Sequence, residues 1–330
     1  LFRSDQYGYI WFGTRSGLSQ YDGKKFVNFF KDTSDSSTLS ANYILELKET
    51  TNSDIWVGTS SGLNKYDRSE GNFIRIRPDQ LENKAVFDVF ERDAQMLMLA
   101  TSKGIFLYNT VSDSIYRSSA FNFFDSLIVK SILPDGDGYL IASRDGLFAE
   151  DNGSIRTVLQ TDVNDLYRDQ NGKIWVAADL GVYTIAPGKK RPERVEKSEA
   201  SGTYGKIQQD SNGNLVVGNL TLEVYTPSGS LLYLENKLLS NPGILSVYCA
   251  PNGALWIGTN GTGVYVLDPN LPAISLVRND NEINIPISSN YISSMYSRDD
   301  NVIFIGAGPG LNRYNRTTGE VTLMANENID

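Results

Sequence analysis

The chain of 330 residues contains no histidine and only one cysteine, Cys249. Without histidine it cannot use Ser-His-Asp catalysis, a histidine general base or a histidine-ligated metal. A single cysteine excludes an intrachain disulfide, which suits the cytosol and equally a periplasmic protein that manages without bridges. No apolar run approaches the roughly 18 residues that a membrane helix needs. Several common enzyme classes and a helical membrane span are therefore excluded.

Basic segments are scarce as well. The formal net charge is −9 with an isoelectric point near 4.8, and no long block of one charge occurs. A nucleic-acid binder would show a basic face, and a membrane tether would show a polybasic run. We therefore expect contact with neither nucleic acid nor membrane. The sequence has no initiator methionine and no signal peptide, so we expect a fragment of a longer protein whose targeting segment is absent.

What the sequence has in quantity is a repeat. Residues 5–22 read as a turn, a strand, a second turn and another strand, and residues 54–67 nearly restate them. Six weaker copies follow, about 42 residues apart on average, which is the period of four-stranded propeller blades. The central residues of the eight copies are Trp11, Trp56, Met98, Leu140, Trp175, Val216, Trp256 and Phe304.

Each copy predicts four strands, A to D, separated by turns rich in Gly, Asp and Asn. In the second copy they are residues 43–48, 55–59, 63–66 and 73–76. Strand B is apolar on both faces in most copies, as expected of a blade that neighbours cover on both sides. We therefore expect the tryptophans of strand B to form core between blades. A platform that stacks on sugars is the alternative for these side chains.

These patterns predict an all-β fold, a β-propeller of four-stranded antiparallel blades with strand A innermost and strand D outermost. Eight copies predict either an eight-bladed ring over residues 1–330 or a seven-bladed ring plus the first blade of a second propeller. In the second arrangement the boundary lies near residue 281.

The wording of the motif is specific. Residues 5–23 read Asp-x-x-Gly-x-Ile-Trp-Phe-Gly-Thr-x-x-Gly-Leu-x-x-Tyr-Asp-Gly, which resembles the two-component regulator propeller repeat, and copies 2, 7 and 8 match it well. In that family the propellers form the periplasmic sensor half of hybrid histidine kinases, which commonly control polysaccharide-utilisation genes in response to oligosaccharides.

The resemblance implies a non-catalytic periplasmic sensor domain that recognises glycans or mediates dimer contacts. It also implies a homodimer in the full-length receptor, further domains downstream in the same chain, and kinase activity that lies outside this fragment. The family motif is structural and transfers no catalytic or ligand-binding residue.

The sequence gives little support for a metal site or a phosphate-binding loop. The turn at residues 135–138, Asp-Gly-Asp-Gly, could hold a calcium ion, but Asp-Gly is common turn chemistry and the remaining members of an EF-hand loop are absent. The Gly-rich residues 258–263 join two strands and open no helix, so they do not predict a phosphate loop. We predict no metal and no cofactor. A carboxylate-based glycosidase or lyase needs no histidine and stays open as the alternative function.

The predicted ligand face follows from propeller topology, in which B–C turns and D–A loops emerge on the same side. These segments vary more than the opposite turns, and they carry Arg and Tyr side chains that could stack on sugars and hydrogen-bond to them. Ordinary exposed loops, or an interface to the next domain, are the alternative. The candidate ligand-binding residues are Arg15, Tyr43, Lys103, Arg144, Asn260 and Tyr291.

Overall fold

The computed structural model falls into two compact units, residues 1–166 and 167–330, which are described separately. The structure describes residues 2–22, 25–195, 207–210, 212–218, 222–235, 244–249, 255–259, 264–267, 275–277, 287–297, 301–308 and 310–324. The predicted site residue Asn260 and the predicted boundary near residue 281 lie outside these ranges.

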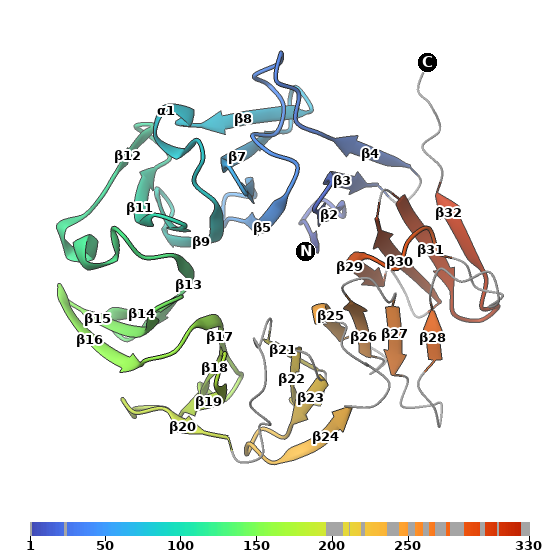
Figure 1. The fold of residues 1–330 in the computed structure, drawn as a ribbon. Helices are drawn as coiled ribbons and strands as arrows, with labels where there is room; N and C mark the ends of the chain where they lie inside the picture. The colour runs from blue at the N-terminus through green and yellow to red at the C-terminus, as the bar shows by residue number, and fades with distance from the viewer. Residues whose placement is uncertain are drawn as a thin grey trace. The chain divides into compact units, whose positions relative to one another are not determined.

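Every motif copy forms one four-stranded antiparallel sheet whose strands lie in chain order (Figure 1). The strands of the first unit are β1 (Phe2–Ser4), β2 (Ile10–Thr14), β3 (Gly17–Tyr21), β4 (Phe26–Phe29), β5 (Ile44–Glu49), β6 (Ile55–Thr59), β7 (Gly62–Asp67), β8 (Asn72–Ile76), β9 (Val86–Asp93), β10 (Met96–Thr101), β11 (Gly104–Asn109), β12 (Ser114–Tyr116), β13 (Val129–Asp135), β14 (Gly138–Ser143), β15 (Gly146–Asp151) and β16 (Ser154–Leu159). The four strands predicted for the second copy are β5 to β8, and each observed boundary lies within one residue of the prediction.

The second unit contains four sheets of the same kind. Its strands are β17 (Val163–Arg168), which begins just before the unit boundary, β18 (Ile174–Ala178), β19 (Gly181–Ile185), β20 (Glu193–Arg194), β21 (Ile207–Gln209), β22 (Leu215–Gly218), β23 (Leu222–Tyr225), β24 (Leu231–Glu235), β25 (Ile244–Cys249), β26 (Leu255–Thr259), β27 (Val264–Leu267), β28 (Ser275–Val277), β29 (Ile292–Ser297), β30 (Val302–Ala307), β31 (Gly310–Asn315) and β32 (Val321–Met324). The prediction of an all-β chain built from four-stranded antiparallel blades is confirmed.

In the part of the chain that the structure describes, two short helices interrupt the strands, and both lie in connections that lead from strand D to the next strand A. They are α1 (Pro78–Leu81) and the 3₁₀ helix η1 (Ser119–Phe124). Among the described residues, neither these nor any other helix has the length and hydropathy of a membrane span.

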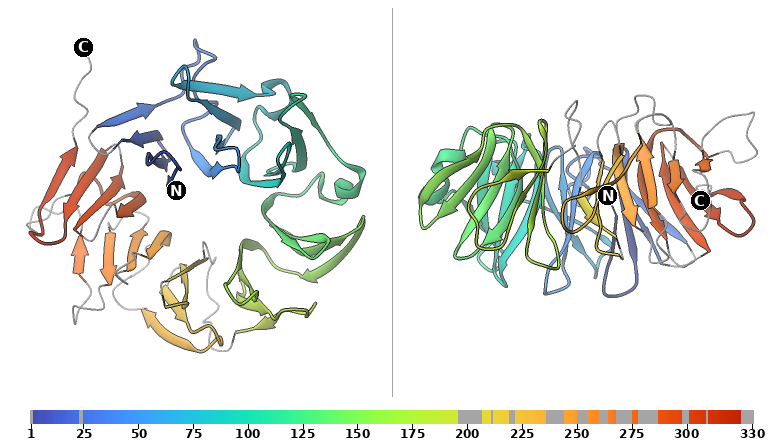
Figure 2. Two further views of the ribbon diagram at one scale, coloured as in Figure 1. Left: turned by 180° about the vertical axis from the view of Figure 1, so that it is seen from behind. Right: turned by 90° about the horizontal axis from the view of Figure 1, so that it is seen from below.

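Within each unit the first strands of neighbouring sheets lie side by side. In the first unit β5 contacts β9 and β9 contacts β13, and in the second unit β21 contacts β25 and β25 contacts β29. The fourth strands β8, β12 and β16 lie apart from one another at the outside of their unit (Figures 1 and 2). This is the predicted order, with strand A inside and strand D outside.

The predicted eight-bladed ring is not supported. Both predicted arrangements contain eight sheets, so the number of sheets does not favour a closed ring of eight blades. A seven-bladed reading of the repeat fits.

The Asp that opens the motif shapes the A–B turn and holds the tryptophan of strand B. Asp5 Oδ1 accepts the backbone N–H groups of Tyr7 and Tyr9, both at 3.0 Å, and Asp5 Oδ2 accepts Trp11 Nε1 at 3.0 Å. Gly8 sits in this turn at φ +83°, a left-handed conformation that favours glycine. Asp169 repeats the arrangement and accepts Trp175 Nε1 at 2.9 Å. The spacing Asp-x-x-Gly-x-Ile-Trp is therefore a hydrogen-bonding unit.

Each described tryptophan packs against a tyrosine from strand C of the next sheet. The pairs are Trp11 with Tyr66, Trp56 with Tyr108 and Trp175 with Tyr225, with ring centroids 4.7, 5.7 and 6.1 Å apart. All three indoles are buried, so the prediction of core between blades is confirmed for them. Burial raises the pKa of Tyr66 and of Tyr108, and the hydrogen bond to Asp113 raises that of Tyr108 further.

The Gly that precedes Thr at the end of strand B lets sheets approach closely. A Cβ built on Gly58 would lie 2.7 Å from the carbonyl oxygen of Val86, which begins the first strand of the next sheet. Because that oxygen belongs to backbone, a side chain at residue 58 would force the two sheets apart.

The second copy lacks the Asp that accepts the tryptophan Nε1–H, and a substitution can restore this acceptor. Thr50 occupies the position of Asp5, and the buried Trp56 Nε1 has no hydrogen-bond partner. The turn is otherwise the same, since Thr50 N donates to Asp54 O as Asp5 N donates to Tyr9 O. We expect Thr50→Asp to raise the free energy of unfolding by about 1 kcal/mol, because it supplies an acceptor to an orphaned buried donor.

Chemical denaturation measures this change. Asn52→Asp is the matched control, because it adds the same charge at an exposed position two residues further on. A loss of stability in Thr50→Asp would show that the cost of burying the carboxylate exceeds the gain from the new hydrogen bond.

Candidate functional site

A hydroxyl at the end of strand B closes each B–C turn of the first unit. Thr14 Oγ1 donates to Gly17 O at 2.9 Å and accepts Ser16 N at 2.9 Å. The same pair of bonds recurs in the next three sheets, at Thr59, Thr101 and Ser143. Each turn therefore has two residues at its tip. Three of the predicted site residues, Arg15, Lys103 and Arg144, occupy such tips and are exposed.

The B–C turns are fastened to the D–A connections. Gly17 N donates to Asn42 O at 2.8 Å, Gly62 N donates to Lys84 O at 2.8 Å and Gly104 N donates to Leu127 O at 2.9 Å. Each of these bonds runs from one sheet to the connection that enters the next sheet. Within the first unit, B–C turns and D–A connections thus form one continuous surface, which we call the turn face.

Arg15 and Tyr43 contact each other on this turn face. The Arg15 guanidinium carbon lies 5.1 Å from the centroid of the Tyr43 ring, and Tyr43 is 38% exposed. Phe30 is 53% exposed and lies close to Gly17, since a Cβ built there would be 2.8 Å from Phe30 Cδ1. A cation and two accessible aromatic rings therefore come from adjacent loops, an arrangement that suits stacking on an apolar ring face.

The other candidates lie apart from this pair in the chain. Lys103 and Arg144 are in the B–C turns of the third and fourth sheets. Tyr291, in the second unit, occupies the position equivalent to Tyr43 and is half-buried, and its carbonyl oxygen accepts Gly308 N at 2.8 Å. The pairing of Arg15 with Tyr43 is the contact that the structure adds to the prediction.

A buried asparagine supports the loop that carries Tyr43, and the sequence analysis missed it. Asn64 donates through Nδ2 to Ser40 Oγ at 2.9 Å and to Val57 O at 3.1 Å, and its Oδ1 accepts Ser40 N at 2.8 Å. Asn312 makes the same three bonds around Ser288 in the second unit. The signal was available, because Ser-x-Asn-Tyr-Ile precedes strand A and Gly-Leu-Asn opens strand C in both copies.

Arg75 orders the longer part of the same connection. Its Nε donates to Thr38 O at 2.8 Å, and its Nη2 donates to Asp32 O at 2.9 Å and to Asp35 O at 2.8 Å. Hydrogen bonds from Ser34 and Ser37 lower the pKa values of the carboxyl groups of Asp32 and Asp35. This connection is therefore a structured part of the turn face.

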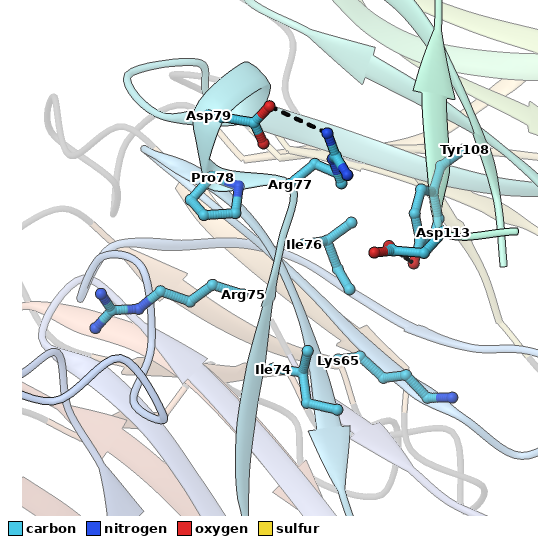
Figure 3. Close-up of a pocket in the computed structure, with 9 residues that line it drawn as sticks. All are labelled: Lys65, Ile74, Arg75, Ile76, Arg77, Pro78, Asp79, Tyr108 and Asp113. Atoms are coloured by element: carbon cyan, nitrogen blue, oxygen red, sulfur yellow. Dashed lines mark hydrogen bonds and ion pairs between the residues drawn. The ribbon is translucent and has the colours of Figure 1, made fainter.

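A separate cavity of about 420 Å³ lies at the outer edge of the second and third sheets (Figure 3). We call it the rim hollow. It is lined by Lys65, Ile74, Arg75, Ile76, Arg77, Pro78, Asp79, Tyr108 and Asp113. None of these residues was a candidate from the sequence. Among the described residues, no group of three or more His, Cys, Asp or Glu side chains is placed to hold a metal ion.

Arg77 has an unusual conformation in the rim hollow. Its backbone lies at φ +39° and ψ +60°, a left-handed conformation for a residue other than glycine. The following Pro78 normally pushes the preceding residue towards extended conformations, so the conformation is strained, by about 1–3 kcal/mol. Arg77 Nε is buried without a hydrogen-bond partner, and Nη2 pairs with Asp79 at 3.2 Å.

The sequence matches the family model of the two-component regulator propeller over residues 238–261. The chain therefore carries a repeat of this family, which confirms the resemblance predicted from the motif. No curated protein matches the chain.

Solved structures share the fold at low sequence identity. The extracellular domain assigned to the hybrid two-component system BT3049 of B. thetaiotaomicron is 15% identical with a TM-score of 0.56, over 98% of this chain and 57% of that one. The chain thus spans little more than half of that domain. The dihydro-heme d1 dehydrogenase NirN is 11% identical with a TM-score of 0.65, over 97% of this chain and 73% of that one. A streptogramin B lyase is 12% identical with a TM-score of 0.56, over 98% and 92%.

Proposed function

We propose that this chain is a non-catalytic sensor domain of a hybrid two-component system, located in the periplasm, and that it recognises glycan-derived ligands. The match to the two-component regulator propeller at residues 238–261 carries the proposal. The likeness of fold to an extracellular domain of such a system supports it. In this proposal, ligand binding or dimer contacts regulate a histidine kinase encoded downstream in the same chain, and through it polysaccharide-utilisation genes.

We place the glycan contact on the turn face, with Arg15 and Tyr43 at its centre. Tyr43 and Phe30 offer accessible ring faces to the apolar side of a sugar, and Arg15 offers several donors to its hydroxyl oxygens. Lys103 and Arg144 are further contacts of the first unit in this proposal, and Asn260 and Tyr291 are proposed separately as contacts of the second unit.

Calorimetry with a panel of oligosaccharides tests this placement. We expect Arg15→Ala combined with Arg144→Ala to weaken the binding of a ligand that the wild type binds by at least about tenfold, or 1.4 kcal/mol. Lys189→Ala combined with Arg191→Ala is the matched control, because it removes two charges from an exposed turn in the second unit. Unchanged affinity in the folded double variant would move the site away from the turn face.

A propeller enzyme, either a carboxylate-based glycosidase or a lyase, is the second candidate. The similarity in fold to a streptogramin B lyase favours it. Product analysis after incubation with the ligand separates the two candidates, because a sensor leaves its ligand intact.

We also propose that the first seven sheets share one ring and that β29–β32 begin a second propeller, with the boundary near residue 281. Spin labels at residues 27, 275 and 323, on the fourth strands of the first, seventh and eighth sheets, test this count. We expect the distance between labels 27 and 275 to be shorter than that between 27 and 323. The reverse order would restore the ring of eight.

A further inference from the structure

Several A–B turns bind a carboxylate that belongs to their own first residue. Asp169 Oδ1 accepts the backbone N–H groups two and four residues further on, at 2.9 and 3.0 Å, and its Oδ2 accepts Trp175 Nε1 at 2.9 Å. Asp5 makes the same three bonds, and Asp210 makes the two bonds to backbone. Backbone N–H groups that converge in this way form an anion-binding concavity, which we call the nest of the turn.

The A–B turn of the second sheet has the same backbone with a different first residue. Thr50 N donates to Asp54 O at 3.0 Å, and Ser53 N donates to Thr50 O at 2.8 Å. Asp5 and Gly8 make the equivalent bonds in the first sheet. Ser53 also has a positive φ of +66°, as Gly8 has at +83°. The second sheet therefore forms the nest, although its first residue carries no carboxylate.

Three donors of this nest lack the acceptor that an aspartate supplies. Within the described residues, no side chain accepts the backbone N–H of Asn52 or of Asp54, and Trp56 Nε1 has no hydrogen-bond partner. Trp56 is only 1% exposed, so its indole N–H is a buried donor. Thr50 cannot replace the aspartate, because its side chain ends one bond short of the position of carboxylate oxygens. The three donors therefore point to an acceptor that comes from outside the chain.

A lysine lies over the indole in this turn, as it does in a turn that holds a carboxylate. Lys65 Nζ is 5.6 Å from the ring centroid of Trp56, and Lys173 Nζ is 5.4 Å from that of Trp175. The second sheet thus combines the donors that bind Asp169 with an ammonium group in a similar place.

Two carboxylates near the turn limit what the nest can bind. Asp54 pairs with Lys65 at 2.7 Å, and Glu91 accepts Thr51 N at 2.9 Å. The local charge is therefore not positive, and the attraction comes from the convergent N–H donors. Repulsion by the two carboxylates grows with the charge of the ligand, so it disfavours a divalent anion relative to a monovalent one.

We propose that the A–B turn of the second sheet binds a small monovalent anion of the size of chloride. The backbone N–H groups of Asn52 and Asp54 and the indole N–H of Trp56 donate to the ion. The Thr50 hydroxyl, whose bond to Asp54 O is long at 3.4 Å, is the fourth donor. The ion satisfies a buried donor and stabilises the folded protein. The site lies at the A–B turns, away from the turn face, and is independent of the proposed function.

Titration with sodium chloride, followed by NMR of the indole N–H signals, tests the assignment. Tryptophan-to-phenylalanine variants assign the signals, and sodium sulfate keeps the ionic strength constant, since the nest disfavours a divalent anion. We expect the Trp56 signal to shift and to reach saturation as chloride rises. The Trp11 and Trp175 signals should not show this saturable shift, because these indoles donate to Asp5 and Asp169.

Two substitutions should change the affinity for chloride in opposite directions. Thr50→Asp brings a carboxylate into the nest, so chloride should bind at least about tenfold more weakly. Asp54→Asn removes a neighbouring carboxylate and keeps the backbone donor, so chloride should bind at least about twofold more tightly. Thr50→Ser is the matched control, because it keeps the hydroxyl group and should leave the affinity within about twofold of that of the wild type.

The inference is overturned if chloride leaves the Trp56 signal in place, because water would then serve the indole donor. It is also overturned if Thr50→Asp shows the same saturable shift as the wild type, because the ion would then lie elsewhere. Bromide in a crystal of the protein provides an independent position. An anomalous peak within hydrogen-bonding distance of Trp56 Nε1 supports the assignment, and a nest without a peak at saturating bromide contradicts it.

Discussion

Trp56→Ala should lower the free energy of unfolding by about 3–5 kcal/mol, as large-to-small core substitutions do. The indole is buried between the second and third sheets, where it packs on Tyr108 with Leu97 and Leu99 in the same cluster. Its removal leaves a cavity that neighbouring strands, fixed by their ladders, can close only in part. Urea denaturation followed by circular dichroism measures the change.

Trp56→Phe provides the control. Because Trp56 Nε1 makes no hydrogen bond, phenylalanine should retain most of the stability at this position. The same change at Trp175, whose Nε1 donates to Asp169, should cost more, because it also removes a buried hydrogen bond. An unchanged melting temperature in Trp56→Ala would mean that this side chain lies outside the core.

Asp169→Ala should lower the free energy of unfolding by about 2–4 kcal/mol, because it leaves several hydrogen-bond donors without an acceptor at once. The buried carboxylate accepts Trp175 Nε1 through one oxygen and the backbone N–H groups of Asn171 and Lys173 through the other. Only the two backbone donors can turn to water, so the buried indole N–H carries most of the cost.

Asp137→Ala is the matched control for this prediction. Asp137 lies exposed in the A–B turn of the fourth sheet, where Leu140 replaces the tryptophan. We expect Asp137→Ala to change the free energy of unfolding by no more than about 0.5 kcal/mol, as for most exposed positions. Equal losses in the two variants would show that Asp serves turn geometry alone and that its hydrogen bond to the indole adds nothing.

The repeat made most of the fold predictable. Alternating and doubly apolar strands, with turn residues at fixed places, predicted every strand of the second copy to within one residue. The role of Asp5 was missed, because turn chemistry already accounted for an Asp at that position. An Asp six residues before the tryptophan, at Asp5 and again at Asp169, was the overlooked signal.

The candidate site was predictable only where it follows the repeat. The register of turns placed Arg15 near the loop that enters the next sheet, and Tyr43 lies there. Arg75 hydrogen-bonds to residues 32–38. Its bond to Thr38 joins side chains 37 residues apart in the sequence, so no local sequence pattern predicts it. The rim hollow was hidden because a residue before proline is expected to be extended, and Arg77 is left-handed.

One measurement tests the central claim that this chain senses its ligand without transforming it. The protein is incubated for a day with a saturating concentration of an oligosaccharide that it binds. The intact ligand is then quantified by mass spectrometry and compared with a sample incubated without protein. The account predicts saturable binding, with all of the ligand recovered intact. Release of more product molecules than there are protein molecules would contradict it and establish an enzyme.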